Sequence, residues 1–135
     1  HMRNDGSIIV IIATDAPLDG RQLARICKRA MLGLARTGGI AYHGSGDVAV
    51  AFSTANRIPH YPKEREMTLR LLSDFWMSDL FEAAEDDAEE AILNALFAAD
   101  DTVGRDGNRA YAIPYDRTRQ LLAEFGSVTP IGARS

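Results

Sequence analysis

The sequence is poor in the residues that build disulfides, metal sites and nucleic-acid surfaces. Its 135 residues include one cysteine and three histidines, so no intramolecular disulfide can form and no two histidines have metal-site spacing. Acidic residues outnumber basic ones, the net charge is −4, and the basic residues form no run. Because affinity for nucleic acid rests mainly on cations that neutralise phosphates, we expect no nucleic-acid partner. The composition implies no metal or organic cofactor.

Long hydrophobic runs are also absent. No apolar stretch approaches the ~20 residues of a membrane span, so we expect no membrane partner. No signal peptide is visible, and His1-Met2 resembles a cloning remnant that takes no part in the fold. We therefore favour a cytoplasmic location. A secretory signal on a longer precursor would not be seen here, which leaves a periplasmic precursor open.

What remains is the composition of a single globular domain, with 46% hydrophobic and 25% charged residues. Residues 7–14 and 48–54 are apolar runs of strand length without alternation, which is typical of strands buried on both faces. Residues 67–72 alternate between apolar and polar side chains and predict a third, half-buried strand.

Helical periodicity explains most of the remaining chain. Apolar residues recur at helical spacing over residues 20–36, with Asp19 as the expected N-cap. A longer helix is expected over residues 77–99, with an acidic face that we interpret as solvated. The acidic residues on that face are Glu82, Glu85, Asp86, Asp87, Glu89 and Glu90.

The C-terminal part combines turns with a short helix. Residues 102–108 are expected to form a turn-rich loop, and residues 115–124 a helix that ends at Gly126. Residues 127–135 are expected to be a flexible tail. The fold class is therefore α/β with the element order β-α-β-β-α-α. Two helices cover only one face of such a small sheet, so a second apolar face would need another layer, and the domain is expected to be half of a larger unit.

Ser7 is the first candidate for chemistry, because it directly follows Gly6 and opens the first strand. Cleavage of the Gly6–Ser7 peptide bond would give Ser7 a free α-amino group, which can serve as the base for its own hydroxyl. A plain junction between a loop and a strand is the alternative. A second polar loop with Ser45 and Asp47 precedes the second strand, and an ordinary polar turn is the alternative there.

Several blocks, taken in order, carry a family resemblance. They are residues 6–18, 32–39, 44–47 with 51–56, 89–96 and 104–107. Together they resemble the β-subunit of the L-aminopeptidase/D-esterase family, which includes β-peptidyl aminopeptidases and nylon-oligomer hydrolases. The resemblance extends from about residue 6 to about residue 125 and is specific because the blocks occur together at suitable spacing.

The resemblance implies a precursor that cuts itself before Ser7 into an α- and a β-subunit. The present chain would be half of an αββα four-layer sandwich that the α-subunit completes, and the heterodimers would assemble further into a homo-oligomer. Residues 1–6 would then be the cloning remnant and the residues upstream of the scissile bond. Residues 7–126 would be the catalytic domain.

The resemblance also implies a mechanism and site residues. The Ser7 hydroxyl would attack the Gly6 carbonyl during processing, and later the amide carbonyl of a peptide or amino-acid amide, forming an acyl-enzyme that releases an N-terminal amino acid. Candidate substrates include β-amino acids and D-residues. Ser45 would relay or orient a proton, and Asp47 would hold the Ser7 ammonium or a substrate amine. Glutamate is usual in the family where this chain has Asp47.

Two alternatives remain open. The fold could serve as a non-catalytic interaction module, which the change at Asp47 would support. The chain could also be an acyltransferase, because ornithine acetyltransferases use a related fold with a threonine nucleophile; Ser7 and residues 15–17 argue against this. The family's oxyanion donors lie on the α-subunit, so the isolated chain with residues 1–6 attached is expected to be inactive.

Overall fold

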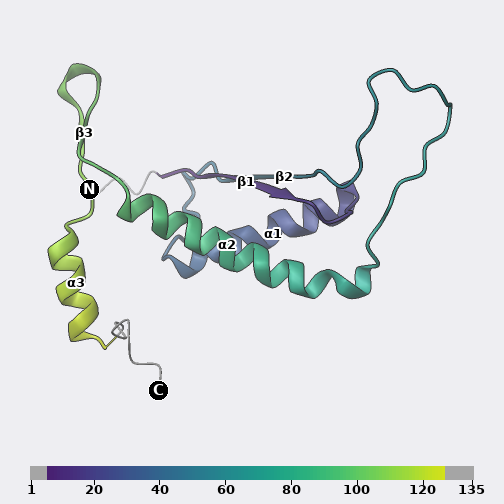
Figure 1. The fold of residues 1–135 in the computed structure, drawn as a ribbon. Coiled ribbons are helices and arrows are strands. Elements are labelled where there is room, and N and C mark those ends of the chain that lie inside the picture. The colour runs from purple at the N-terminus through teal and green to yellow at the C-terminus, as the bar shows by residue number, and fades with distance from the viewer. Residues whose placement is uncertain (1–5, 127–135) are drawn as a thin grey trace. The chain divides into compact units, whose positions relative to one another are not determined.

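A computed structural model describes residues 6–126, which fall into two units that divide between Ile92 and Leu93. In the first unit, two parallel strands are connected by a helix, and a second helix comes after them (Figure 1). These elements are β1 (Ile9–Thr14), α1 (Gly20–Arg36), β2 (Val48–Ser53) and α2 (Met77–Phe97), with a short 3-10 turn at Asp74–Trp76. The predicted boundaries of the first two strands and of both helices agree with these to within two residues.

Helix α1 begins where its capping signals predict. The Asp19 side chain accepts a hydrogen bond from the Gln22 backbone N–H at 2.7 Å, and the Gln22 side chain accepts one from the Asp19 N–H at 3.2 Å. This reciprocal pair satisfies two of the amide groups that a helix start leaves without partners. The helix ends before Gly38, whose φ of 93° is a conformation that favours glycine.

Helices α1 and α2 approach closely at Gly33, which is buried. A Cβ atom at this position would lie 2.8 Å from the Ala88 Cβ and 2.9 Å from the Glu89 nitrogen, and it would also collide with the Glu85 carbonyl oxygen. Only glycine fits here without movement of a helix. The main core consists of Leu18, Ile26, Met77 and Ala84.

The acidic face of α2 is only partly solvated, which corrects the sequence interpretation. Arg36, in the last turn of α1, binds Glu85 at 2.9 Å, Asp86 at 2.5 Å and Glu89 at 3.3 Å. Its guanidinium pKa is raised, first by the hydrogen bond to Asp86. Three of the acidic residues therefore hold α1 and α2 together.

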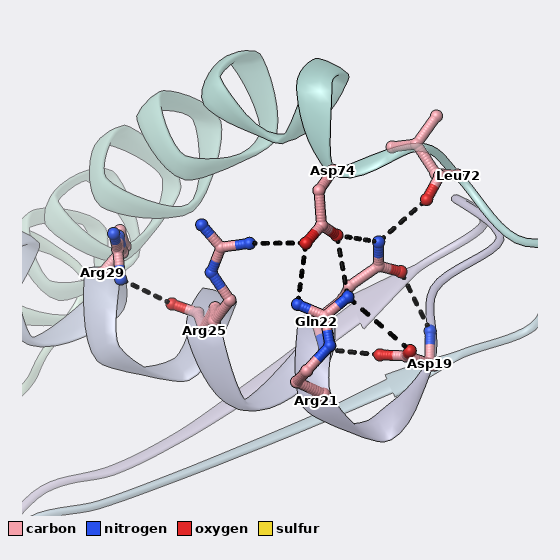
Figure 2. Close-up of polar contacts among 7 residues, drawn as sticks. All are labelled: Asp19, Arg21, Gln22, Arg25, Arg29, Leu72 and Asp74. Atoms are coloured by element: carbon pink, nitrogen blue, oxygen red, sulfur yellow. Dashed lines mark hydrogen bonds and ion pairs between the residues drawn. The ribbon is translucent and has the colours of Figure 1, made fainter.

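A second polar cluster ties the start of α1 to the segment that precedes α2 (Figure 2). Arg21 binds both oxygens of Asp74 at 2.8 and 2.9 Å. The fully buried Gln22 donates from Nε2 to the Leu72 carbonyl at 2.8 Å and to Asp74 at 2.7 Å. The Asp74 pKa is lowered to about 2, first by the hydrogen bond from Arg21 and then by that from Gln22. Its charged form therefore contributes to the fold.

One face of the sheet is half-buried under the helices and the other is uncovered, as expected for a domain that is half of a larger unit; the predicted burial of both faces is not reached within this chain. Figure 1 shows both helices on the same side of β1 and β2. On the other face, the register pairs Ile9 with Val48 and Ile11 with Val50. These side chains are 72%, 49%, 71% and 52% exposed, respectively. The two-stranded sheet thus presents an uncovered apolar face, which we call the open sheet face and define by these four residues and Phe52.

The third strand predicted over residues 67–72 is not formed. The segment is anchored by the Asn56 side chain, which donates to the Arg70 carbonyl at 2.9 Å and accepts from its N–H at 3.0 Å. The Leu72 N–H donates to the Pro17 carbonyl at 2.7 Å. No other strand of the described chain lies alongside the segment, and a strand needs a partner for its backbone groups. The alternating side chains Leu69 and Leu71 remain exposed.

The second unit consists of the last residues of α2, a small hairpin and a helix. Strands β3 (Thr102–Val103) and β4 (Arg109–Ala110) pair antiparallel around a 3-10 turn at Arg105–Gly107, and α3 (Tyr115–Glu124) comes next. The predicted turn is confirmed, but the two short strands within residues 102–110 were not predicted. No described residue from 93 to 126 is buried, so this unit has no core of its own.

Two of the sequence predictions lie outside the described residues: the N-terminal segment 1–6, the cloning remnant with the residues upstream of the scissile bond, of which only Gly6 is described, and the tail at residues 127–135. Within residues 6–126 no helix combines the length and the apolar character that crossing a membrane requires. The same part of the chain contains no cluster of three or more side chains suited to binding a metal ion.

Candidate active site

The candidate site lies where β1 and β2 begin. Because the two strands are parallel and in register from Ile9 and Val48 onward, the residues that precede them meet at one end of the sheet. The Val48 N–H donates to the Ile8 carbonyl at 2.9 Å, which extends the pairing toward the loop. Ser7 therefore lies beside the loop that contains Ser45 and Asp47, although 38 positions separate Ser7 from Ser45 in the sequence.

Ser7 is exposed, and its hydroxyl is held by the backbone of the neighbouring loop. The Gly46 N–H donates to Ser7 Oγ at 3.0 Å. This contact fixes the position of the oxygen. Because Oγ is the acceptor, the hydroxyl proton is not used in this bond and can be donated to another group. The contact also places an amide donor where negative charge on Oγ would be stabilised.

Ser45 bridges the peptide bond before Ser7 and the carboxylate of Asp47. Its Oγ lies 2.6 Å from the Gly6 carbonyl oxygen and 2.6 Å from Asp47 Oδ1. Because a hydroxyl has a single proton, Ser45 can donate to only one of these two acceptors at a time. The arrangement is therefore suited to move a proton between the carboxylate and the carbonyl, or to direct it toward the carbonyl.

Asp47 joins the loop to the first strand. Its Oδ1 accepts the hydrogen bond of the Ile8 N–H at 3.2 Å in addition to the contact with Ser45. The predicted contact between Asp47 and the Ser7 nitrogen is not among the hydrogen bonds of the described residues, in which Gly6 is still joined to Ser7 by a peptide bond. In this state the carboxylate positions Ser45 and the start of β1.

A pocket of about 320 Å³ lies directly beside Ser7. Leu34, Ile40 and Tyr42 contribute apolar surface, and Ser7, Ser45 and Asp47 contribute the polar groups. Such a combination of apolar walls and a few convergent polar groups is typical of small-molecule sites.

The loop around this pocket contains a strained residue and a tight turn. Ala41 has a φ of 46°, which is uncommon for a residue with a side chain. Next to it, the Ser45 N–H donates to the Tyr42 carbonyl at 2.7 Å, closing a turn that includes His43. His43 is exposed and does not line the pocket, as expected for a loop residue.

The structure thus brings together all four residues predicted for the site, Gly6, Ser7, Ser45 and Asp47. Sequence reasoning missed the donor role of the Gly46 amide and the pocket wall formed by Leu34, Ile40 and Tyr42. A glycine between the two polar loop residues was the visible hint of a close backbone approach. The pocket wall had no comparable signature, because its members are ordinary apolar residues at a helix end and in a loop.

The chain is similar to known peptidases over most of its length. The model of peptidase family S58 matches residues 1–110. A curated relative, beta-peptidyl aminopeptidase BapA of Sphingosinicella microcystinivorans, is 40% identical over 121 residues, which are 90% of this chain and 31% of the relative.

The chain is also similar to solved structures over most of its length. A structure of the L-aminopeptidase D-Ala-esterase/amidase of Ochrobactrum anthropi, described as a variant of the Ntn hydrolase fold, has a TM-score of 0.83 and 36% identity, covering 96% of this chain and 38% of that one. The crystal structure of a protein from Pyrococcus horikoshii OT3 has a TM-score of 0.82 and 55% identity, covering 89% and 34% of the two chains. The chain thus spans only about a third of the length of the proteins that it matches.

Proposed function

Because this chain belongs to peptidase family S58, we propose that it is the catalytic β-subunit of a self-processing aminopeptidase with Ser7 as the nucleophile. The observation that carries the proposal is the position of Ser45, whose hydroxyl lies 2.6 Å from the carbonyl oxygen of the bond that would be cut. An ordinary loop-to-strand junction has no need for a hydroxyl that lies against that carbonyl and also contacts a carboxylate.

The first reaction is cleavage of the chain itself. Ser7 Oγ attacks the Gly6 carbonyl carbon, the bond from that carbon to the Ser7 nitrogen breaks, and the hydroxyl proton ends on the released amine. Negative charge develops on the Gly6 oxygen during attack, where the Ser45 hydroxyl can stabilise it. Water then hydrolyses the resulting ester, which leaves a Gly6 carboxylate and a free Ser7 hydroxyl.

The second reaction uses the same hydroxyl on a substrate. The new α-amino group of Ser7 accepts the hydroxyl proton, and Oγ attacks the carbonyl of the substrate's N-terminal residue. The amine portion leaves, and water hydrolyses the acyl-enzyme. The apolar wall of Leu34, Ile40 and Tyr42 would accept the side chain of that residue, and Asp47 would attract its amino group. The substrate is therefore a peptide or amide with a free N-terminus, built from α- or β-amino acids.

The open sheet face supports the subunit part of the proposal. A row of valine, isoleucine and phenylalanine side chains on one side of a two-stranded sheet is a large apolar patch for a soluble protein. The second unit, in which no described residue is buried, also supports a partner that covers it. The relatives are about three times as long, and we infer that their additional polypeptide, as an α-subunit, covers this face and completes a four-layer sandwich.

The test is the intact mass of the chain produced together with its upstream part. Cleavage should release a chain that begins at Ser7, and a Ser7→Ala precursor should remain uncut. Ser78→Ala is the matched control, because Ser78 is exposed on α2 and its hydroxyl makes no hydrogen bond with another described residue. Hydrolysis of β- and α-amino-acid amides would then be measured on the cut protein. A Ser7→Ala precursor that is still cut before residue 7 would overturn the proposal, and an uncut wild-type precursor would favour the non-catalytic module.

A further inference from the structure

The end of α1 and the loop after it form one wall of the pocket beside Ser7. Leu34 lines this pocket of about 320 Å³ from the last turn of α1, and Gly39 lines it from the loop. Leu34 is half-buried, so part of its side chain is accessible to a ligand in the pocket. The size of this side chain therefore affects the volume that is left for a ligand.

The backbone of Leu34 is held in place by three hydrogen bonds to its carbonyl oxygen. Thr37 donates from its N–H at 3.2 Å and from its hydroxyl at 2.8 Å, and the Gly39 N–H donates at 3.1 Å. Such bonds satisfy the carbonyl groups that a helix end leaves without partners. They also fix the point from which the Leu34 side chain projects, so a shift of the backbone does not easily compensate for a change in its size.

Gly39 lacks a side chain at a position where Leu34 leaves no space for one. A Cβ atom on Gly39 would lie 2.6 Å from Leu34 Cδ1 and 2.7 Å from Leu34 Cγ. Gly39 does not have a positive φ, so space and not backbone conformation requires glycine here. Leu34 is therefore supported by the loop on one side, and it cannot tilt toward Gly39 to make room for a ligand.

The space that Leu34 limits adjoins the bond-making atoms. Gly6 and Ser7 belong to the same pocket lining, and the Ser45 hydroxyl there lies 2.6 Å from the Gly6 carbonyl oxygen. In an acyl-enzyme the substrate's carbonyl carbon is bonded to Ser7 Oγ, and the side chain of its N-terminal residue follows within one or two bonds. That side chain must then enter the adjoining space. Additional polypeptide that filled this space would block the nucleophile.

We propose that Leu34, supported by Gly39, sets the largest N-terminal side chain that the pocket accepts. The inference rests on the proposed function and assigns a specificity-determining residue to the same site. The two positions act in opposite directions. A smaller residue at position 34 enlarges the pocket, whereas a Cβ atom at position 39 displaces the Leu34 side chain into the pocket that it already lines.

The experiment measures substrate preference in variants of the protein produced with its upstream part. The substrates are the p-nitroanilides of alanine and phenylalanine and of their β-homologues, and the readout is the ratio of kcat/KM for the large residue to that for the small one. Leu34→Ala should raise this ratio at least about tenfold, because a single methylene in an apolar pocket is worth about 10–200-fold. Gly39→Ala should lower it. Leu34→Val, a smaller change, should raise it less than Leu34→Ala does.

The double variant tests whether Gly39 acts through Leu34. Leu34→Ala removes both atoms that a Cβ on Gly39 would meet within 3.0 Å, so Leu34→Ala with Gly39→Ala should give the ratio of Leu34→Ala alone. Two independent effects would instead multiply. Leu32→Ala is the matched control, because Leu32 lies on the same helix, is 50% exposed and does not line the pocket, and it should leave the ratio unaltered.

The ratio separates specificity from stability and from incomplete processing. Both substrates are assayed on one preparation, so the amount of folded and cut enzyme cancels, and a variant that is only partly cut still reports its preference. Ratios that stay at the wild-type value in Leu34→Ala and Leu34→Val would overturn the inference, as would a Gly39→Ala ratio that rises. An uncut wild-type precursor would overturn the proposed function and this inference together, whereas a cut and active enzyme with unaltered ratios would overturn this inference alone.

Discussion

Replacing Gly33 by alanine tests the close approach of α1 and α2, which positions the pocket residue Leu34. The added Cβ would meet atoms of α2 at 2.8 and 2.9 Å, one of them a backbone nitrogen, and would also collide with a backbone carbonyl. Backbone atoms cannot rotate away, so the helices must separate. Overpacking of this kind lowers the free energy of unfolding by about 1–3 kcal/mol. The better helix propensity of alanine offsets only about 0.5–1 kcal/mol of this loss.

We therefore expect Gly33→Ala to lower the free energy of unfolding by about 1–2 kcal/mol and, in a protein about three times as long as this chain, the melting temperature by roughly 1–3 °C. The assay is thermal unfolding monitored by circular dichroism, on the protein produced with its upstream part. Gly20→Ala is the control, since it makes the same change at the start of the same helix, where the added Cβ would meet no atom within 4 Å apart from its chain neighbours and the backbone of its own helix. If both variants melt at the same temperature, the packing described for α1 and α2 is wrong.

Three further predictions concern the site, the open sheet face and the polar cluster. Ser45→Ala removes the donor to the Gly6 carbonyl and should slow self-cleavage by about 10²–10³-fold in a mass-spectrometric time course, whereas an unchanged rate would exclude Ser45 from the reaction. Ile11→Glu places a charge on the open sheet face and should abolish copurification with the upstream part after cleavage, and retained copurification would argue against that face as the interface. Asp74→Asn should lower the melting temperature at pH 7. Because the Asp74 pKa is lowered to about 2, mainly by Arg21, the stability from its charge is present above about pH 4 and is lost as the pH falls through 2. Melting scans of both proteins should therefore converge toward pH 2, and a difference that persists there would contradict the assignment.

Local patterns predicted the helices and the first two strands well. The limits of α1 could be placed from an N-cap at Asp19 and glycines after its end, which are interactions between near neighbours in the sequence. The site was predictable for a different reason. Ser7 and the loop with Ser45 gained meaning only from the family resemblance, and parallel strand pairing explains why they meet.

The errors arose where distant parts of the chain decide the outcome. Residues 67–72 alternate like a strand, but pairing depends on a neighbour that the described chain does not supply. The acidic side of α2 has the spacing of a solvated face, and nothing near it in the sequence indicates that Arg36, about 50 positions earlier, binds three of its members. The apolar character of both sheet faces was read correctly from the residues, but the second face is not covered within this chain.

The contact between Ser45 and Gly6 also bears on the release of the upstream peptide after cleavage. Before the cut, a neutral carbonyl lies 2.6 Å from the Ser45 hydroxyl, and the Asp47 carboxylate lies 2.6 Å from it on another side. In the proposed reaction, hydrolysis converts that carbonyl into a carboxylate, so two negative charges would share one hydroxyl. Their repulsion would expel the departing peptide, oppose re-formation of the bond, and vacate the pocket for a substrate with a positive N-terminus.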